Sequence, residues 1–391
     1  MTGKAWVDVP LAAVGQIVTG TTPSSGDVDA WGSDVPFLTP TDIVGSTRFV
    51  RTGRHLSQRG VSRLRTRLLP NSSVCFTCIG ATIGKMCMTS GLTVTNQQIN
   101  SIVVDKERFD PVFVYFNLRH HSRRIAGMAS GSATPIINKE AFGRQRLSFP
   151  GLGTQRAIAE VLGALDDKIE AIRTLAKKAE CLAVALPAST VATTTVGAIA
   201  AVCHKLVPTA FFATRAVEHF SLPAFDAGRL PIIENGDGIK SGKFLLEGAT
   251  VLVSKLNPHI PRVWMATPSE TWPAITSTEF VGLVPTADYP VAALWALCAS
   301  SEFSSQLVEM VKGTTGSHQR VSPEDVLALE VPDPRTLGQE TTETIAATVD
   351  LAGTLRRESV HLTTLRDALL PRLLSGDLRV RDAEALVEGA V

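Results

Sequence analysis

"PGLGTQRAIAEVLGALDDKIEAIRTLAKKAECLAVALP", residues 150–187, lies between two prolines near the middle of the chain and predicts one uninterrupted helix. Its apolar residues recur at alternating steps of four and three. This is the spacing of a coiled-coil seam and not the wider apolar stripe of a helix that lies on a globular core. At 1.5 Å per residue the helix would be about 50 Å long. The seam consists of Ile158, Leu162, Leu165, Ile169, Ile172, Ala176, Ala179, Ala183 and Leu186.

The composition is that of a folded protein with more than one domain. Hydrophobic residues make up 44% and charged residues 19% of the 391 residues, which argues against global disorder. The length predicts two or three domains. The N-terminus lacks a signal-peptide pattern, and the longest charge-free run, residues 181–204, is broken by Pro187 and by several Ser and Thr residues. We therefore expect a cytoplasmic protein without a membrane span.

The charge is distributed unevenly along the chain. Residues 1–150 carry 17 Lys and Arg against 9 Asp and Glu, a net charge of +8, whereas residues 151–391 carry 21 against 28, a net charge of −7. No acidic residue occurs between Ile43 and Val104, a stretch that contains seven arginines and Lys85. A solvated surface usually mixes both signs, so this stretch favours contact with a polyanion such as nucleic acid.

The chain also contains an internal repeat with a period of about 185 residues. "LAAVGQI" (residues 11–17) corresponds to "VGAIAAV" (residues 196–202), and "LLPNSSVCFTCIG" (residues 68–80) to "LLEGATVLVSKLN" (residues 245–257). "VPFLTP" (residues 35–40) is matched more loosely with "LPIIEN" (residues 230–235). Each copy mixes short alternating strands with helical segments, which predicts two α+β or α/β globules.

A second long helix follows the second globule. We expect it to begin near Thr336 and to end at Gly376, with Pro371 in its last turns. Because each helix needs an apolar partner, the two should pair antiparallel as a stalk with one globule at each end, related by an approximate two-fold axis. The predicted seam of this helix consists of Leu351, Leu355, Leu362, Leu365 and Leu369. The expected layout is globule 1–150, helix 151–187, globule 188–335, helix 336–376 and tail 377–391.

No motif indicates a catalytic centre. "GATIGK" (residues 80–85) and "GIKSGK" (residues 238–243) have three residues between their glycines and no Ser or Thr after the lysine, so neither is a Walker loop. The chain lacks the GxSxG and HExxH motifs, and "NPHI" (residues 257–260) lacks the second proline and the aromatic residue of an amino-methyltransferase motif. Cys75 and Cys78 form a CxxC without a second pair, which favours buried, reduced thiols over a metal site.

Several segments together resemble the specificity subunit of type I restriction–modification systems. They are "TPSSGDVDAWGSDVPFLTPTDI", "GATIGK", "TNQQIN", the block from Ser132 to Ile172 and "LRDALLPRLLSGDL". The resemblance extends over about residues 5–380 and is weak in the second globule. No single segment is decisive, whereas their order and the duplicated layout are specific.

This resemblance implies a non-catalytic subunit that reads double-stranded DNA. Each globule would be a target-recognition domain for one half of a bipartite sequence, and the paired helices would set the gap between the halves. Two methylation subunits would bind around the helices and supply S-adenosylmethionine and adenine methylation. A motor-nuclease subunit, which uses ATP and Mg²⁺, would complete the restriction complex.

Candidate DNA-binding residues follow from charge and from loop position, with phosphate contacts expected from the arginines and base contacts from polar loops. We expect about half of the arginines in the first globule to serve the fold instead. The second globule, residues 187–334, has a net charge of −5, so its attraction to phosphates should be local. The candidates are Thr39, Thr41, Arg48, Arg51, Arg54, Arg59, Arg63, Arg65, Arg67, Lys85, Ser132, Thr134 and Asn138 in the first globule, and Lys240, Lys243, Lys255, Arg262, His318 and Arg320 in the second.

Two other functions remain open at the level of sequence. The chain could be an enzyme with an unrecognised nuclease or methyltransferase site, which should show catalytic carboxylates or a cofactor loop. It could also be a coiled-coil adaptor with two protein-binding heads, which would not need an acid-free stretch rich in arginine.

Overall fold

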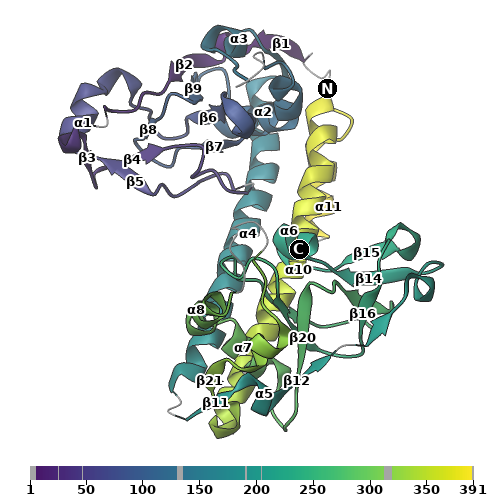
Figure 1. Cartoon of the computed structure of the whole chain (residues 1–391). Coiled ribbons are helices and arrows are strands. Elements are labelled where there is room, and N and C mark those ends of the chain that lie inside the picture. Colours follow the sequence, from purple (N-terminus) through teal and green to yellow (C-terminus); the bar gives the residue numbers. More distant parts are fainter. Residues whose placement is uncertain are drawn as a thin grey trace. The chain divides into compact units, whose positions relative to one another are not determined.

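The computed structural model of the protein describes residues 6–24, 26–45, 47–129, 135–189, 192–203, 205–311 and 319–389. The chain divides into two compact units: unit 1 contains residues 1–170 and 362–391, and unit 2 contains residues 171–361. Each unit mixes short strands with helices, as the sequence predicts (Figure 1). None of the described helices has the length and apolar character needed to cross a membrane.

Two long helices, α4 (Leu152–Ala185) and α10 (Gln339–Ser375), run through both units. In unit 1, Asp166 of α4 contacts Arg366 of α10, and in unit 2, Glu180 of α4 contacts Arg356 of α10. Because residue numbers rise along α4 while those of its partners fall along α10, the helices are antiparallel. This confirms the predicted pairing, and Figure 1 shows the two helices side by side.

The seam of α4 lies where the spacing places it. Every predicted seam residue from Ile158 to Ala183 is buried, and Leu186, in the short 3₁₀ turn that follows α4, is partly buried. Three of the buried positions are alanines, which occupy less space between the helices than leucines would.

The seam of α10 differs from its prediction at Leu351, which is 47% exposed. Leu355, Leu362 and Leu369 are buried and Leu365 is half-buried. The prediction selected leucines, whereas small and polar residues occupy several seam positions. One heptad position is filled in turn by Ile345, Ala352, Ser359, Arg366 and Leu373, all buried.

The ends of α10 also differ from expectation. The helix begins at Gln339, because Thr336 belongs to a 3₁₀ turn (Pro334–Thr336) in which its hydroxyl donates to the Asp333 carbonyl. Gly376 ends it in the left-handed region with φ +80°, as predicted. The expected tail contains a further helix, α11 (Val380–Glu388), with Ala383 fully buried.

The described residues of unit 1 form two four-stranded sheets and a two-stranded ribbon. The first sheet is antiparallel throughout, and the second contains one parallel pair, β4 with β8. The hydrophobic core of unit 1 contains Val18, Leu38, Cys75, Cys87 and Ile99. The first sheet has the order β2 (Gly15–Thr19), β9 (Ile99–Val104), β6 (Val74–Thr77) and β7 (Met86–Met88); the second has β3 (Trp31–Gly32), β5 (Arg54–Leu56), β4 (Val35–Leu38) and β8 (Val94–Thr95); the ribbon pairs β1 (Val7–Pro10) with β10 (Arg146–Phe149).

Unit 2 has a corresponding set of sheets, with five strands in the second. That sheet again contains one parallel pair, β14 with β19. The first sheet has the order β12 (Ala200–Cys203), β20 (Phe280–Pro285), β17 (Thr250–Ser254) and β18 (Val263–Ala266); the second has β13 (Leu206–Val207), β16 (Lys243–Leu246), β19 (Ala274–Thr276), β14 (Ala216–Phe220) and β15 (Ile232–Asn235); the ribbon pairs β11 (Thr193–Thr195) with β21 (Glu330–Pro332).

The strand orders β2-β9-β6-β7 and β12-β20-β17-β18 are equivalent, which confirms the internal repeat. One predicted correspondence is wrong. "VPFLTP" forms β4, which pairs parallel with β8; its equivalent is β14, which pairs parallel with β19. "LPIIEN" instead forms β15, which occupies the place of β5. The loops between these strands differ in length, so the sequence match was displaced by one strand.

The helices of the two units also correspond. In unit 1, α2 begins after Asp110, whose carboxylate accepts hydrogen bonds from the Val112 and Phe113 amides. In unit 2 the equivalent segment is divided, because the Ser300 hydroxyl caps the second part. The helices are α1 (Gln58–Arg63), α2 (Pro111–Ala126) and α3 (Lys139–Gly143) in unit 1, and α5 (Val196–Ile199), α6 (Leu222–Gly228), α7 (Val291–Cys298), α8 (Ser301–Glu309) and α9 (Pro323–Leu327) in unit 2.

Candidate nucleic-acid interface

One loop of unit 1, residues 78–85 between β6 and β7, has an irregular backbone that glycines permit. Gly80 and Gly84 both have positive φ angles, +78° and +93°. The loop is held against residues 135–136, because the Gly80 amide donates to the Pro135 carbonyl at 3.0 Å and Ile79 forms a β-bridge with Ile136. This geometry is that of a structural turn and not of a Walker loop.

Beside this loop lies a cavity of about 360 Å³ with a basic wall. Lys85, which the sequence selected, is exposed and lines it. Arg119, Ser122 and Arg123 of α2 line the same cavity, so the loop and the helix together present cations and a hydroxyl. These three residues are not among the sequence-based candidates, which come from the acid-free stretch and from polar loops. Their spacing, which places them on one face within one turn, could have identified them.

The equivalent loop of unit 2 is residues 255–262, between β17 and β18. Leu256 forms a β-bridge with Arg320, as Ile79 does with Ile136 in unit 1. Asn257 has φ +52° at the place of Gly80, and its side-chain oxygen is buried without a hydrogen-bond partner among the described residues. Lys255 and Arg262 are the first and last residues of this loop, and Arg320 lies beside it, so three of the predicted cations gather at one loop.

The three cations at this second loop differ in their freedom to bind a ligand. Arg262 makes two hydrogen bonds to Asp226, of 2.7 and 2.9 Å, and this carboxylate raises the pKa of the guanidinium. Arg320 donates to Glu279 at 3.1 Å. Lys255 is half-buried, and its ammonium has no ion pair within the described part of the chain. Lys255 is therefore the least engaged of the three.

Some arginines of the arginine-rich stretch in unit 1 bond other groups of the protein, and others do not. Arg48 is buried and forms an ion pair with Asp167 of α4, so its predicted DNA contact is corrected to a structural role. Arg67 donates to the Thr19 carbonyl at 3.1 Å. The exposed Arg59 and Arg63 are paired with Asp29 and Asp27, respectively.

The remaining arginines of this stretch have no carboxylate partner among the described residues. The guanidinium carbon of Arg54 lies 3.5 Å from the centre of the Trp31 ring, a cation–π contact. Arg51 is exposed and lines a cavity of about 310 Å³ together with His55 and Thr93. Arg65 is exposed in a 3₁₀ turn. Arg51 and Arg65 are thus the freest arginines of the stretch.

The predicted polar contacts in unit 1 are mostly occupied by local hydrogen bonds. The Thr39 hydroxyl donates to Asp42 and is 2.8 Å from the Thr41 hydroxyl, while Thr41 itself is exposed. The Asn138 side chain accepts from the Ala141 amide and caps α3. Ser132 and Thr134 of unit 1 and His318 of unit 2 lie outside the described residues.

The two lysines predicted at residues 238–243 also bond locally. Lys240 is exposed, and its ammonium donates to the Asp237 carbonyl at 3.1 Å. Lys243 is buried and donates to the carbonyl and the hydroxyl of Ser241, which makes phosphate contact by this residue less favourable. Burial lowers the pKa of the Lys243 ammonium.

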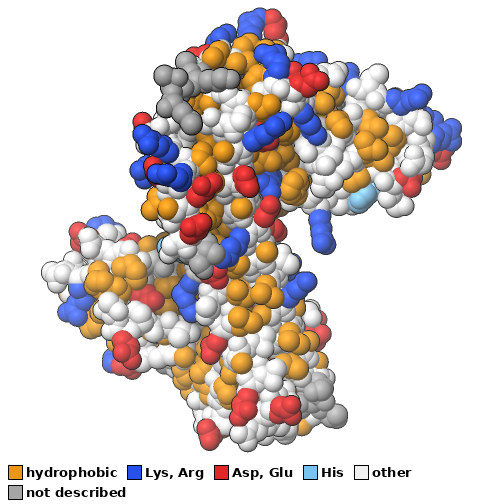
Figure 2. All heavy atoms as spheres, turned by 180° about the vertical axis from the view of Figure 1, so that it is seen from behind, with side chains coloured by type: hydrophobic (Ala, Val, Ile, Leu, Met, Phe, Trp, Pro, Cys, Tyr) orange, Lys and Arg blue, Asp and Glu red, His pale blue; other side chains and the backbone are white. Residues whose placement is uncertain are grey.

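On the face drawn in Figure 2, the described basic side chains do not form one continuous patch. In the view of Figure 2, Lys and Arg side chains are scattered and interspersed with hydrophobic and acidic ones. The candidate interface is therefore a set of local loops in each unit. Among the described residues, no three His, Cys, Asp or Glu side chains gather in a way that could hold a metal ion.

The cysteines of the CxxC are buried, as predicted. Cys75 lies opposite Cys87 on the neighbouring strand β7, and Cys78 accepts a hydrogen bond from the Asn100 amide group at 3.2 Å. Burial raises the pKa of the Cys78 thiol to about 11, which leaves it protonated at neutral pH.

Comparison with known proteins gives a consistent result. Residues 3–180 match the family model for the type I restriction modification DNA specificity domain. The chain is 35% identical over 150 residues to the type I restriction enzyme HindI specificity subunit of Haemophilus influenzae, a match that covers 38% of this chain and 32% of that protein. It is 25% identical over 170 residues to the MjaIX specificity subunit of Methanocaldococcus jannaschii, covering 43% of this chain and 39% of that protein.

The similarity of fold extends further than the similarity of sequence. The type I restriction–modification S subunit from M. genitalium matches 95% of this chain and 97% of its own with a TM-score of 0.62 and 14% identity. The sequence matches span only about a third of the length of the two curated relatives. Residues 3–180 of this protein thus match the type I restriction modification DNA specificity domain, and the fold of the chain is similar to that of a type I restriction–modification S subunit.

Proposed function

We propose that this protein reads DNA sequence for a type I restriction–modification complex, with the globule of each unit recognising one half of a bipartite target. One observation carries the proposal: both units repeat the same four-stranded sheet, and each places an irregular loop between its equivalent strands, residues 78–85 and 255–262. Two equivalent loops with nearby cations suit two half-sites read by the same architecture.

The helices α4 and α10 would set the gap between the half-sites. A helix of this length spans more than one turn of B-DNA at 3.4 Å per base pair. The chain itself would have no catalytic activity and no cofactor. S-adenosylmethionine would be bound by the methylation subunits, and ATP with Mg²⁺ by a motor-nuclease subunit, in a complex that works in the cytoplasm.

The outward surface of the paired helices supports docking of two methylation subunits. Leu175 and Leu182 of α4, two turns apart on one helix face, are 49% and 51% exposed, and Leu351 of α10 is also exposed. Leu182→Lys should abolish co-purification with the methylation subunit, whereas Leu92→Lys, at an exposed leucine in a loop of unit 1, should not. Equal retention of the partner by both variants would exclude this docking surface.

The experiment for DNA reading is modified-base sequencing of DNA from cells that express the chain with its neighbouring methylation subunit. We expect a methylated-adenine motif of two short halves with a fixed gap, absent without this chain. Lys85→Ala with Arg123→Ala should weaken recognition of one half, and Lys255→Ala that of the other. An active methylation subunit without any such motif would instead favour the adaptor with two protein-binding heads.

A further inference from the structure

Three polar residues recur at intervals of seven along α4: Asp166, Arg173 and Glu180. Each directly follows a buried seam residue, Leu165, Ile172 or Ala179, and therefore flanks the seam on the same side of the helix. Side chains that flank a coiled-coil seam contact the facing helix and influence which partner it accepts. The signs of these three side chains alternate as negative, positive and negative.

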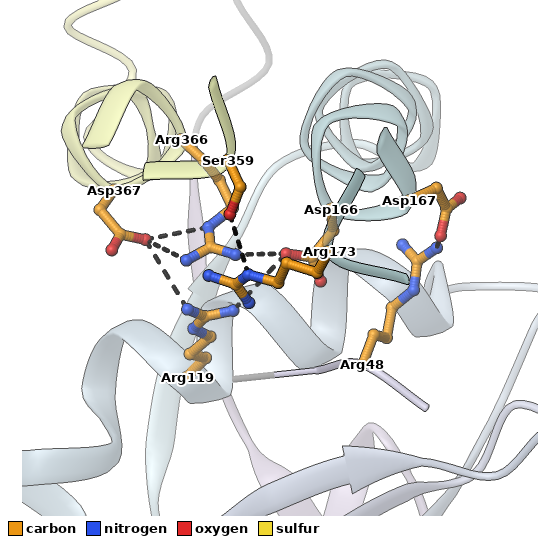
Figure 3. A network of polar contacts seen from close by, with 8 residues as sticks. All are labelled: Arg48, Arg119, Asp166, Asp167, Arg173, Ser359, Arg366 and Asp367. Carbon is orange, nitrogen blue, oxygen red and sulfur yellow. Dashed lines mark hydrogen bonds and ion pairs between the residues drawn. The ribbon is translucent and has the colours of Figure 1, made fainter. Parts of the chain in front are cut away.

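Each of the three side chains meets a polar residue of α10. In unit 1, the buried carboxylate of Asp166 forms an ion pair with the buried guanidinium of Arg366, and Figure 3 shows both projecting into the space between the helices. In unit 2, the Arg173 Nε donates to the Ser359 hydroxyl at 3.1 Å, and Glu180 pairs with Arg356. In these two ion pairs the carboxylate thus comes from α4 and the guanidinium from α10.

A second arginine, from the globule, contacts each of these two carboxylates. In unit 1, an Arg119 nitrogen of α2 lies 3.8 Å from Asp166 and another lies 3.7 Å from Asp367, which is half-exposed at the rim and also bonds Arg366. In unit 2, Arg229 lies 3.1 Å from Glu180. In each unit, one carboxylate of α4 therefore binds both an arginine of α10 and an arginine of that unit's globule. This carboxylate is Asp166 in unit 1 and Glu180 in unit 2.

Burial makes these contacts selective. Loss of water around the guanidinium disfavours the charged form of Arg366, but Asp166 and Asp367 outweigh this effect and raise its pKa. Removing one partner of such a buried pair leaves an uncompensated charge in a medium that solvates it poorly. A helix that lacks an opposite charge facing Asp166 is therefore strongly disfavoured as a partner of α4.

We propose that α4 and α10 recognise each other through opposite charges at these positions, so that each accepts the other in a single register and rejects a copy of itself. Two α4 helices paired antiparallel about Arg173 would place Asp166 opposite a second Glu180 and Arg173 opposite its own copy. Two α10 helices would bring Arg356 and Arg366 together without Asp166 or Glu180. The pairing surface of α4 thus fits α10 and does not fit a second α4.

Charge exchange in the full-length chain tests the proposal. Asp166→Arg alone and Arg366→Asp alone each create an unbalanced buried charge, whereas the double variant restores neutrality beside Arg119 and Asp367. We expect each single variant to lower the thermal unfolding midpoint by several degrees and the double variant to recover at least half of the larger loss. A double variant as unstable as the worse single variant would overturn the proposal.

The control is the exposed pair formed by Glu140 of α3 and Arg144, the residue that follows α3, in which the same exchange should leave the midpoint unchanged. If either single variant is insoluble, co-expression of the two differently tagged single variants keeps the test decisive. Exchange of helices between the two chains brings every introduced charge opposite its complement, so a soluble 1:1 complex is expected. Failure of both the double variant and the co-expressed pair to give soluble protein would refute the charge-based pairing.

Discussion

Gly163 of α4 lies directly against Arg48: a β-carbon at residue 163 would come within 2.9 Å of a guanidinium nitrogen. The absence of a side chain there lets Arg48 reach Asp167 on the same helix, as Figure 3 shows. An arginine from a stretch that appeared suited to DNA therefore joins a loop of the globule to the helix.

Arg48→Met should accordingly lower the free energy of unfolding by about 1–2 kcal/mol through lost packing and the lost ion pair. The salt dependence of DNA binding should stay unchanged, because this side chain does not face solvent. Chemical denaturation and DNA titrations at several salt concentrations measure the two effects. A reduced salt dependence with unchanged stability would return Arg48 to the interface.

Arg51 and Arg65 should behave in the opposite way. Both are exposed and lack a carboxylate partner among the described residues. Replacing both with glutamine should reduce the slope of log K against log salt by about two at most, since each phosphate contact contributes roughly 0.9. The unfolding midpoint should not move. An unchanged slope in a folded double variant would remove these residues from the proposed interface.

Sequence could not separate Arg48 from Arg51, because the partner that distinguishes them, Asp167, is 119 residues away from Arg48. The same limit explains Arg119, whose contacts with Asp166 and Asp367 depend on the tertiary fold. Charge and loop position identified which segments are basic. They could not identify which side chains the fold already uses.

The fold was more predictable where periodicity is strong. Long apolar repeats predicted α4 correctly because every seam position is apolar. In α10, Ser359 and Arg366 occupy seam positions, so a search for leucines selected Leu351 on the outer surface. Short strands such as β14 and β15 carry too few residues to fix a repeat by sequence alone, and β4 was therefore matched to β15 instead of to its neighbour β14.

The helix pair should act as a ruler in the proposed complex. Seven residues inserted after Ile172 and seven after Ser359 would preserve the heptad phase and the facing charges. At 1.5 Å per residue the addition is about 10 Å, so the unread gap should lengthen by about three base pairs at 3.4 Å each. Modified-base sequencing gives the gap directly. An active complex with the original gap would contradict the ruler.

An insertion in α4 alone is the control for this prediction. It would displace Asp166 from Arg366 or Glu180 from Arg356, and the chain should lose stability instead of acquiring a new gap.

Acid should destabilise unit 1 through His121. Burial, together with His120 and Arg124, lowers the pKa of His121 from 6.5 to about 4. Between these values the unfolded chain binds a proton that the folded chain does not, so the free energy of unfolding falls as the pH decreases from about 6.5 to about 4. His121→Gln should reduce the loss of the thermal midpoint between pH 7 and pH 5. The control is His259→Gln, because His259 is exposed. If the thermal midpoint falls equally between pH 7 and pH 5 in the wild type and in both variants, His121 does not have this role.

Unit 1 is built from two separate stretches of the chain, and this determines when it can finish folding during synthesis. Unit 2 is a single stretch of chain, whereas unit 1 needs residues 362–391 as well as residues 1–170. At about 5–20 residues per second, roughly 10–40 s separate the synthesis of these two parts. During that interval Asp166 has no Arg366, so the first globule to emerge from the ribosome is the last to be completed.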